Sequence, residues 1–103
     1  MTLSDIILNR NHYIDSDEII HMVFAKRYED GFEPFSEATV LELTLDEMQL
    51  DLVEIENIKC PGYSYFLEIN IIQDFFEDIE LSDNYKSEED KVKRVIHYAE
   101  FDA

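Results

Sequence analysis

The chain has 103 residues, 46% of them hydrophobic, and carries 25 Asp and Glu against 8 Lys and Arg, a formal net charge of −17. This length indicates one domain over residues 1–103, and the apolar content excludes a disordered tail. The charge excludes a conventional nucleic-acid binder, which needs cations to contact phosphates, and predicts repulsion from anionic membrane surfaces.

Cysteine usage and the lack of long apolar runs bear on the compartment. The one cysteine, Cys60, excludes an intrachain disulfide and is typical of a reducing environment. No segment reaches the roughly 18 apolar residues of a membrane span, and Met1–Asp5 lacks the basic region that opens a secretory signal. We therefore expect a cytoplasmic protein that does not bind membranes.

Helical spacing is the main pattern in the first third of the chain. Leu3–Asn9 fits one or two helical turns, and the asparagines that follow favour a turn. Acids at residues 15–18 then precede apolar residues at helical spacing, with two cations in the final turn, where the helix dipole favours them. The sequence predicts a helix at about residues 16–28, and a further short helix could begin at Ser36.

Residues 38–53 allow two interpretations. The leucines of Leu41–Leu45 alternate as in a strand, so a hairpin turning at Asp46–Glu47 is one of them. Against it, Thr44 is followed three residues later by a glutamate, which is the capping-box spacing, and the later apolar residues keep a helical period. An Asp-Glu pair is also a poor tight turn, since neither residue readily takes positive φ. These features favour a helix at about residues 45–57.

The most apolar stretch follows the break at Cys60-Pro61-Gly62. Helical spacing over about residues 65–80 places its large apolar side chains in one row, which is typical of a central helix covered by several neighbours. A strand over residues 63–69 leading into a shorter helix is the alternative. The predicted row consists of Phe66, Ile69, Ile72, Phe76 and Ile79.

The last predicted helix begins after Ser87, which is a good cap ahead of an acidic first turn. It should bury Val92, Val95 and Ile96. The sequence as a whole predicts a mainly α fold, a small bundle of four to five helices around the helix at about 65–80. The alternative is an α+β fold with a hairpin at about 38–53.

No set of residues indicates catalysis. Glu18 and His21 have the Glu-x-x-His spacing of carboxylate di-iron bundles, but no second such pair exists, and we interpret them as a surface pair on a helix. Cys60 lacks a nucleophile signature around it and is interpreted as a small hydrophobe. We expect a protein that is not an enzyme and that uses no metal or cofactor.

The acids and one tyrosine instead indicate a partner-binding surface. Tyr63 follows the Pro-Gly turn with acids on both sides, and tyrosine is enriched in binding hot spots; the alternative is that it belongs to the core. Lys59 is the one basic residue between Tyr28 and Tyr85. The predicted partner-binding residues are Tyr63, Asp46, Glu47, Asp51, Glu54, Asp74, Glu77 and Asp78.

These features favour an acidic binding protein that inhibits a basic, nucleic-acid-acting partner by occlusion. It would be an immunity protein or antitoxin to a nuclease-type toxin, or an inhibitor that mimics nucleic-acid charge. The small acidic immunity proteins of nuclease bacteriocins, with acids around a tyrosine pair, are analogous in kind. The partner would be a basic protein, and the chain would not bind nucleic acid directly.

The second hypothesis comes from a family. Ile79-Glu80-Leu81-Ser82-Asp83, followed by a helix with Val92, Ile96 and Tyr98, is similar to the Ile-Glu-Ile-Pro-Asp run and last helix of acyl carrier proteins. The run from Phe66 to Tyr98 thus resembles the back half of that family. The resemblance implies a carrier or adaptor domain with Ser64 near the phosphopantetheine serine. The family's Asp-Ser-Leu is Tyr63-Ser64-Tyr65 in this chain.

Overall fold

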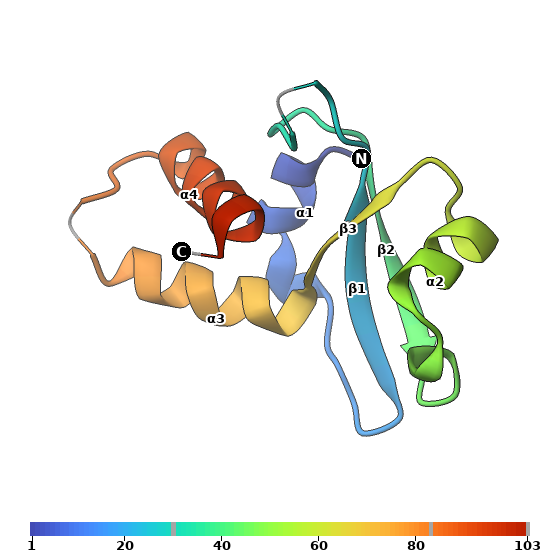
Figure 1. The fold of residues 1–103 in the computed structure, drawn as a ribbon. Helices are drawn as coiled ribbons and strands as arrows, with labels where there is room; N and C mark the ends of the chain where they lie inside the picture. The colour runs from blue at the N-terminus through green and yellow to red at the C-terminus, as the bar shows by residue number, and fades with distance from the viewer. Residues whose placement is uncertain (30, 83, 103) are drawn as a thin grey trace.

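A computed structural model describes residues 1–29, 31–82 and 84–102, which form an α+β fold with a three-stranded antiparallel sheet between helices (Figure 1). In chain order the elements are α1 (Leu3–Leu8), η1 (Arg10–His12), β1 (Ile19–Ala25), β2 (Ala38–Thr44), η2 (Glu47–Gln49), α2 (Leu52–Lys59), β3 (Ser64–Glu68), α3 (Ile69–Glu80) and α4 (Glu88–Phe101). The predicted mainly α bundle is therefore wrong, and the α+β alternative fits.

The sheet is organised around β1, which lies between the other two strands in the order β2-β1-β3. It pairs with β2 from Ile19 opposite Thr44 to Ala25 opposite Ala38. Its pairing with β3 is shorter and shifts register between Val23 and Phe24, so Phe66 of β3 is left without a partner in the ladder.

The helix predicted at about residues 16–28 is wrong, because this segment is the central strand. Successive β1 side chains alternate between two clusters, with Val23 and Ala25 in one and Met22 and Phe24 in the other. A strand buried on both faces presents a nearly continuous apolar run, and such a run carries no period of two that would separate it from a helix.

The two clusters lie on opposite faces of the sheet. On one face, α1, α3 and α4 pack together against the strands in the larger cluster, and on the other face α2 covers a smaller one (Figure 1). The helices of the larger cluster contribute Leu3, Ile6, Ile7, Ile69, Ile72, Phe76, Ile79, Val92, Val95 and Ile96. The smaller cluster consists of Met22, Phe24, Leu43, Ile55 and Cys60.

The predictions for residues 38–57 are corrected in detail. The leucine alternation does mark a strand, but β2 pairs with β1, which precedes it, and not with a strand after Asp46. The capping interactions also form: the Thr44 amide donates to Glu47 Oε1 (3.1 Å), and the Glu47 amide donates to Thr44 Oγ1 (3.3 Å). They open the single turn η2, and α2 begins only at Leu52, so the helix predicted at 45–57 is wrong in its first part.

The stretch at 65–80 takes the alternative form, a strand followed by a shorter helix. Within α3 the predicted apolar row is confirmed, because Ile69, Ile72, Phe76 and Ile79 are all buried. The α4 prediction is also confirmed: Ser87 Oγ accepts from the Asp90 amide at 3.1 Å. No helix forms at Ser36, whose buried hydroxyl accepts from the Glu33 amide within a loop.

Candidate partner-binding surface

The structure divides the predicted partner-binding acids between opposite faces of the sheet. One group lies in or beside η2 and α2, and the other lies on α3 (Figure 1). The first group is Asp46, Glu47, Asp51 and Glu54, and the second is Asp74, Glu77 and Asp78. The sequence predicted all seven as partner contacts and left open whether they form one face, and the strand order separates them.

The acids of α3 are exposed on the side opposite the buried row. A cation of the chain itself lies beside them. Arg10 stacks over the Phe76 ring, with its Cζ 3.6 Å from the ring centroid, and its Nη2 is 2.7 Å from Glu80 Oε1. The same arginine lines a hollow of about 210 Å³ together with Glu77. The chain therefore supplies positive charge to this side of its own surface.

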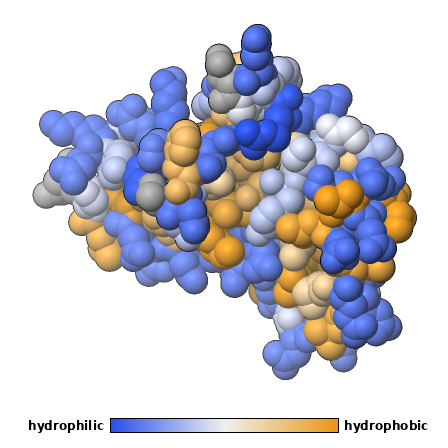
Figure 2. All heavy atoms as spheres, in the orientation of Figure 1, coloured by the Kyte–Doolittle hydropathy of each residue, from blue (hydrophilic) through white to orange (hydrophobic). Residues whose placement is uncertain are grey.

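The face that carries α2 combines acids with exposed apolar side chains. We call it the α2 surface and define it as Leu45, Asp46, Leu50, Asp51, Leu52, Val53, Glu54 and Ile58, all of which are exposed. Figure 2 shows hydrophobic side chains gathered on the right of the molecule, where α2 lies, interspersed with hydrophilic ones.

Lys59, the one cation of α2, is paired with Glu47 beside this surface. The ion pair joins η2 to the last turn of α2. The hydrogen bond from Lys59 lowers the pKa of the Glu47 carboxyl, and the bond from the Thr44 amide lowers it further. Glu47, a predicted contact residue, is thus already occupied within the chain, whereas Asp46, Asp51 and Glu54 are exposed to solvent.

Tyr63 is half-buried and joins a small polar network instead of standing free. Its ring packs against the smaller cluster, and its hydroxyl donates to the Glu37 carboxylate. Lys26 Nζ lies 3.0 Å from Glu37 Oε2 and 5.4 Å from the centroid of the Tyr63 ring. Tyr63 therefore shares in the core as well as in the surface, while Tyr65 packs edge-on against Phe24, as expected of a core residue.

This network predicts a pH dependence. The hydrogen bond to Glu37, and then burial, raise the pKa of Tyr63 above 10.0. The folded chain holds this proton more tightly than the unfolded one, so the contribution to stability is complete below the unfolded pKa and is lost as pH rises through the folded pKa. We expect Glu37→Gln to lower the Tyr63 pKa, measured by phenolate absorbance. Tyr63→Phe serves as the control that assigns this titration, and an unchanged pKa would contradict the network.

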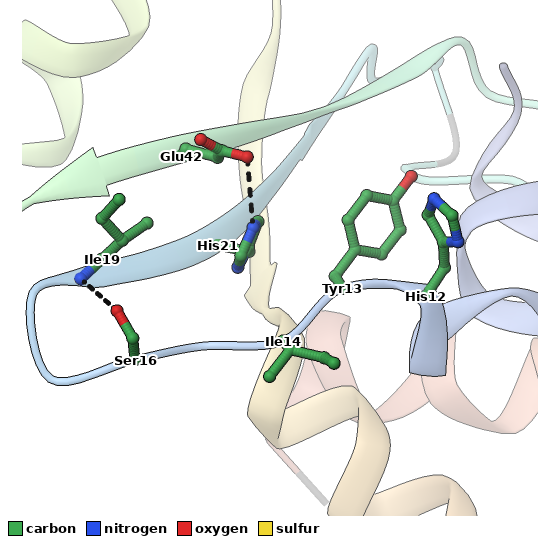
Figure 3. A pocket seen from close by; sticks show the side chains of 7 residues that line it. All are labelled: His12, Tyr13, Ile14, Ser16, Ile19, His21 and Glu42. Carbon is green, nitrogen blue, oxygen red and sulfur yellow. Dashed lines mark hydrogen bonds and ion pairs between the residues drawn. The ribbon is translucent and has the colours of Figure 1, made fainter.

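A second feature is a hollow of about 330 Å³ lined by His12, Tyr13, Ile14, Ser16, Ile19, His21 and Glu42 (Figure 3). The buried His21 lies within it: its Nδ1 is 2.7 Å from Asp15 Oδ1, and its Nε2 is 3.6 Å from Glu42 Oε1. The predicted surface pair of Glu18 and His21 on a helix is wrong, because His21 is a buried residue of β1 and Glu18 lies in the bend before that strand.

Ser16, which lines the hollow, interacts with the backbone of the next residues. Ser16 Oγ accepts from the amides of Glu18 and Ile19, at 3.3 and 3.2 Å, and so closes the turn that leads into β1 (Figure 3). Asp15 holds His21 through both the ring and the backbone amide, the latter at 2.8 Å. Among the described residues, no group of three His, Cys, Asp or Glu is placed to hold a metal ion. The arrangement fastens the segment before β1 to the sheet.

Removing Asp15 tests that role. Asp15→Ala leaves the His21 ring and amide without their acceptor, and we expect the free energy of unfolding to fall by about 1–3 kcal/mol. Equilibrium unfolding in urea measures this. Asp17→Ala, at an exposed neighbouring position, should stay within about 0.5 kcal/mol of the parent chain. Equal losses in the two variants would show that Asp15 fastens nothing.

Two further residues from the sequence hypotheses are placed by the fold. Cys60 is buried in the smaller cluster, where burial raises the pKa of its thiol and disfavours the nucleophilic thiolate. Ser64 is the first residue of β3 and pairs with Ala25. The run from Phe66 to Tyr98, which resembles acyl carrier proteins, begins within β3 and continues into α3 and α4.

No protein-family model, curated protein or solved structure matches this chain. Within the described ranges, no helix combines the length and the apolar character needed to cross a bilayer.

Proposed function

We propose that this chain is an acidic binding protein that inhibits a basic, nucleic-acid-acting partner by occlusion. It acts as an immunity protein or antitoxin to a nuclease-type toxin, or as an inhibitor that mimics nucleic-acid charge. The partner uses Lys and Arg to grip phosphates. The acids of this chain cover those cations, so the chain needs no catalytic group of its own.

The observation that carries the proposal is the way in which the few cations are used. Among the described residues, five Lys and Arg side chains form ion pairs with glutamates of the same chain. The chain carries 25 acids against 8 Lys and Arg, so most of its negative charge remains uncompensated. Such a field speeds association with a basic protein and repels nucleic acid.

The test is capture of a partner followed by an activity assay. The chain, immobilised and mixed with an extract of its source cell freed of nucleic acid, should retain a basic protein that elutes as salt rises. The purified partner should cleave or modify nucleic acid, and one equivalent of the chain should abolish that activity. A retained partner that is acidic, that resists salt, or that stays active at saturation would refute the proposal.

A further inference from the structure

We infer that the α2 surface is where the partner docks, and that it receives a protein surface with an apolar centre ringed by Lys and Arg. The inference rests on the proposed function for the sign of the partner's charge. Beyond that function, it assigns binding to the acidic face of α2 and not to that of α3. It also requires the partner to present apolar side chains, which mimicry of nucleic-acid charge alone would not need.

Exposed apolar side chains select this face. Twelve large apolar side chains are exposed among the described residues, and five of them lie within residues 45–58. Val53 and Ile58 of α2 are 65% and 67% exposed, and Leu45 is 56% exposed. By contrast, none of these twelve exposed side chains belongs to α3. Phe75 of α3 is half-buried and stacks on Tyr98, with 4.5 Å between the ring centroids. Contiguous exposed apolar side chains rimmed by polar residues are typical of protein–protein interfaces.

The composition of α2 supports the same conclusion. Its four apolar side chains, Leu52, Val53, Ile55 and Ile58, are interleaved with four polar ones and lie on more than one side of the helix, yet Ile55 is its one buried residue. An amphipathic surface helix typically turns its apolar side chains towards the core, and three of the four in α2 are exposed instead. Within the described chain the sheet covers only the Ile55 side. A partner on the outer side would complete the burial.

Charge decides what that partner is. Asp46, Asp51 and Glu54 lie among the exposed apolar side chains, and Glu47 neutralises Lys59. A second copy of the chain would bring the same acids and a net charge of −17 to the contact, which opposes self-association through this face. A partner surface with Lys and Arg around an apolar centre would cover the exposed apolar side chains of the α2 surface and pair with its carboxylates.

Three helical peptides of about 18 residues, each roughly five turns, test this against the isotope-labelled full chain. The first alternates Leu and Lys with helical period, so that one face is apolar and the other basic. The second has the same charge but Gln in place of Leu, and the third has Glu in place of Lys. Amide chemical shifts in NMR report where each peptide binds and how tightly. We expect the Leu/Lys peptide to shift residues 45–58 and to bind about tenfold more tightly than either control.

Matched variants localise the effect. Val53→Ser with Ile58→Ser should weaken the Leu/Lys peptide about tenfold, whereas neutralising Asp74, Glu77 and Asp78 on α3 should weaken it about twofold. Both sets of positions are exposed, so the fold should persist. Chemical-shift changes centred on α3, or a Lys/Gln peptide that binds as tightly as the Leu/Lys peptide, would refute docking at the α2 surface. Neither result would contradict a basic partner. Equal or tighter binding of the Leu/Glu peptide would overturn the basic partner itself.

Discussion

Phe76→Ala is expected to lower the free energy of unfolding by about 3–5 kcal/mol, a large part of the roughly 5–15 kcal/mol that a domain possesses. The Phe76 side chain is 3% exposed and lies in the larger cluster between the sheet and the helices. Its ring also supports the Arg10 guanidinium, which pairs with Glu80 as well. Equilibrium unfolding in urea would measure the loss.

The neighbouring ring provides the control for Phe76. Phe75 is half-buried and stacks on Tyr98, so Phe75→Ala removes the same number of atoms from a site that solvent already reaches. We expect a loss of about 1–2 kcal/mol. Equal losses of stability in the two variants would contradict the placement of Phe76 inside the larger cluster and of Phe75 at its edge.

The sequence could predict those elements that bury one face only, because their apolar residues then repeat with the period of the element. In α4, a serine cap, an acidic first turn and an apolar stripe agree, and in α3 the buried row follows from helical spacing alone. The strand β1 is buried on both faces, each against a different cluster, so its apolar residues do not alternate with polar ones. The apolar run that results also fits a helix, so local reasoning chose the wrong element.

The candidate site was harder to predict, since it depends on which strands are neighbours. His21 meets Glu42 because the two residues are directly opposite in the β1–β2 ladder, 21 positions apart in sequence. The acids of α2 and α3 lie on opposite faces because β3 joins these helices across the sheet. The abundance of acids was visible from composition, but their division between two surfaces was not.

Gly31→Ala is expected to cost about 2–4 kcal/mol, the second large effect in this chain. Gly31 has φ +107°, a backbone conformation that residues with a side chain rarely adopt. A Cβ added at this position would lie 2.7 Å from Glu100 Oε1. That carboxylate accepts from the Phe32 amide at 2.8 Å and pairs with Arg27 at 3.1 Å. The new methyl group would therefore both strain the backbone and displace the carboxylate of α4 that ties this loop to the larger cluster.

Two comparisons separate these causes. Gly62 has φ +89° with no atom within 4 Å of an added Cβ, so Gly62→Ala should show the backbone strain alone, about 1–2 kcal/mol. With Glu100→Ala already present, Gly31→Ala should also cost only about 1–2 kcal/mol, because the displaced group is gone. Urea unfolding of the four chains of this double-mutant cycle measures the coupling. Strict additivity would show that Gly31 is required for its backbone conformation and not for its contact with Glu100.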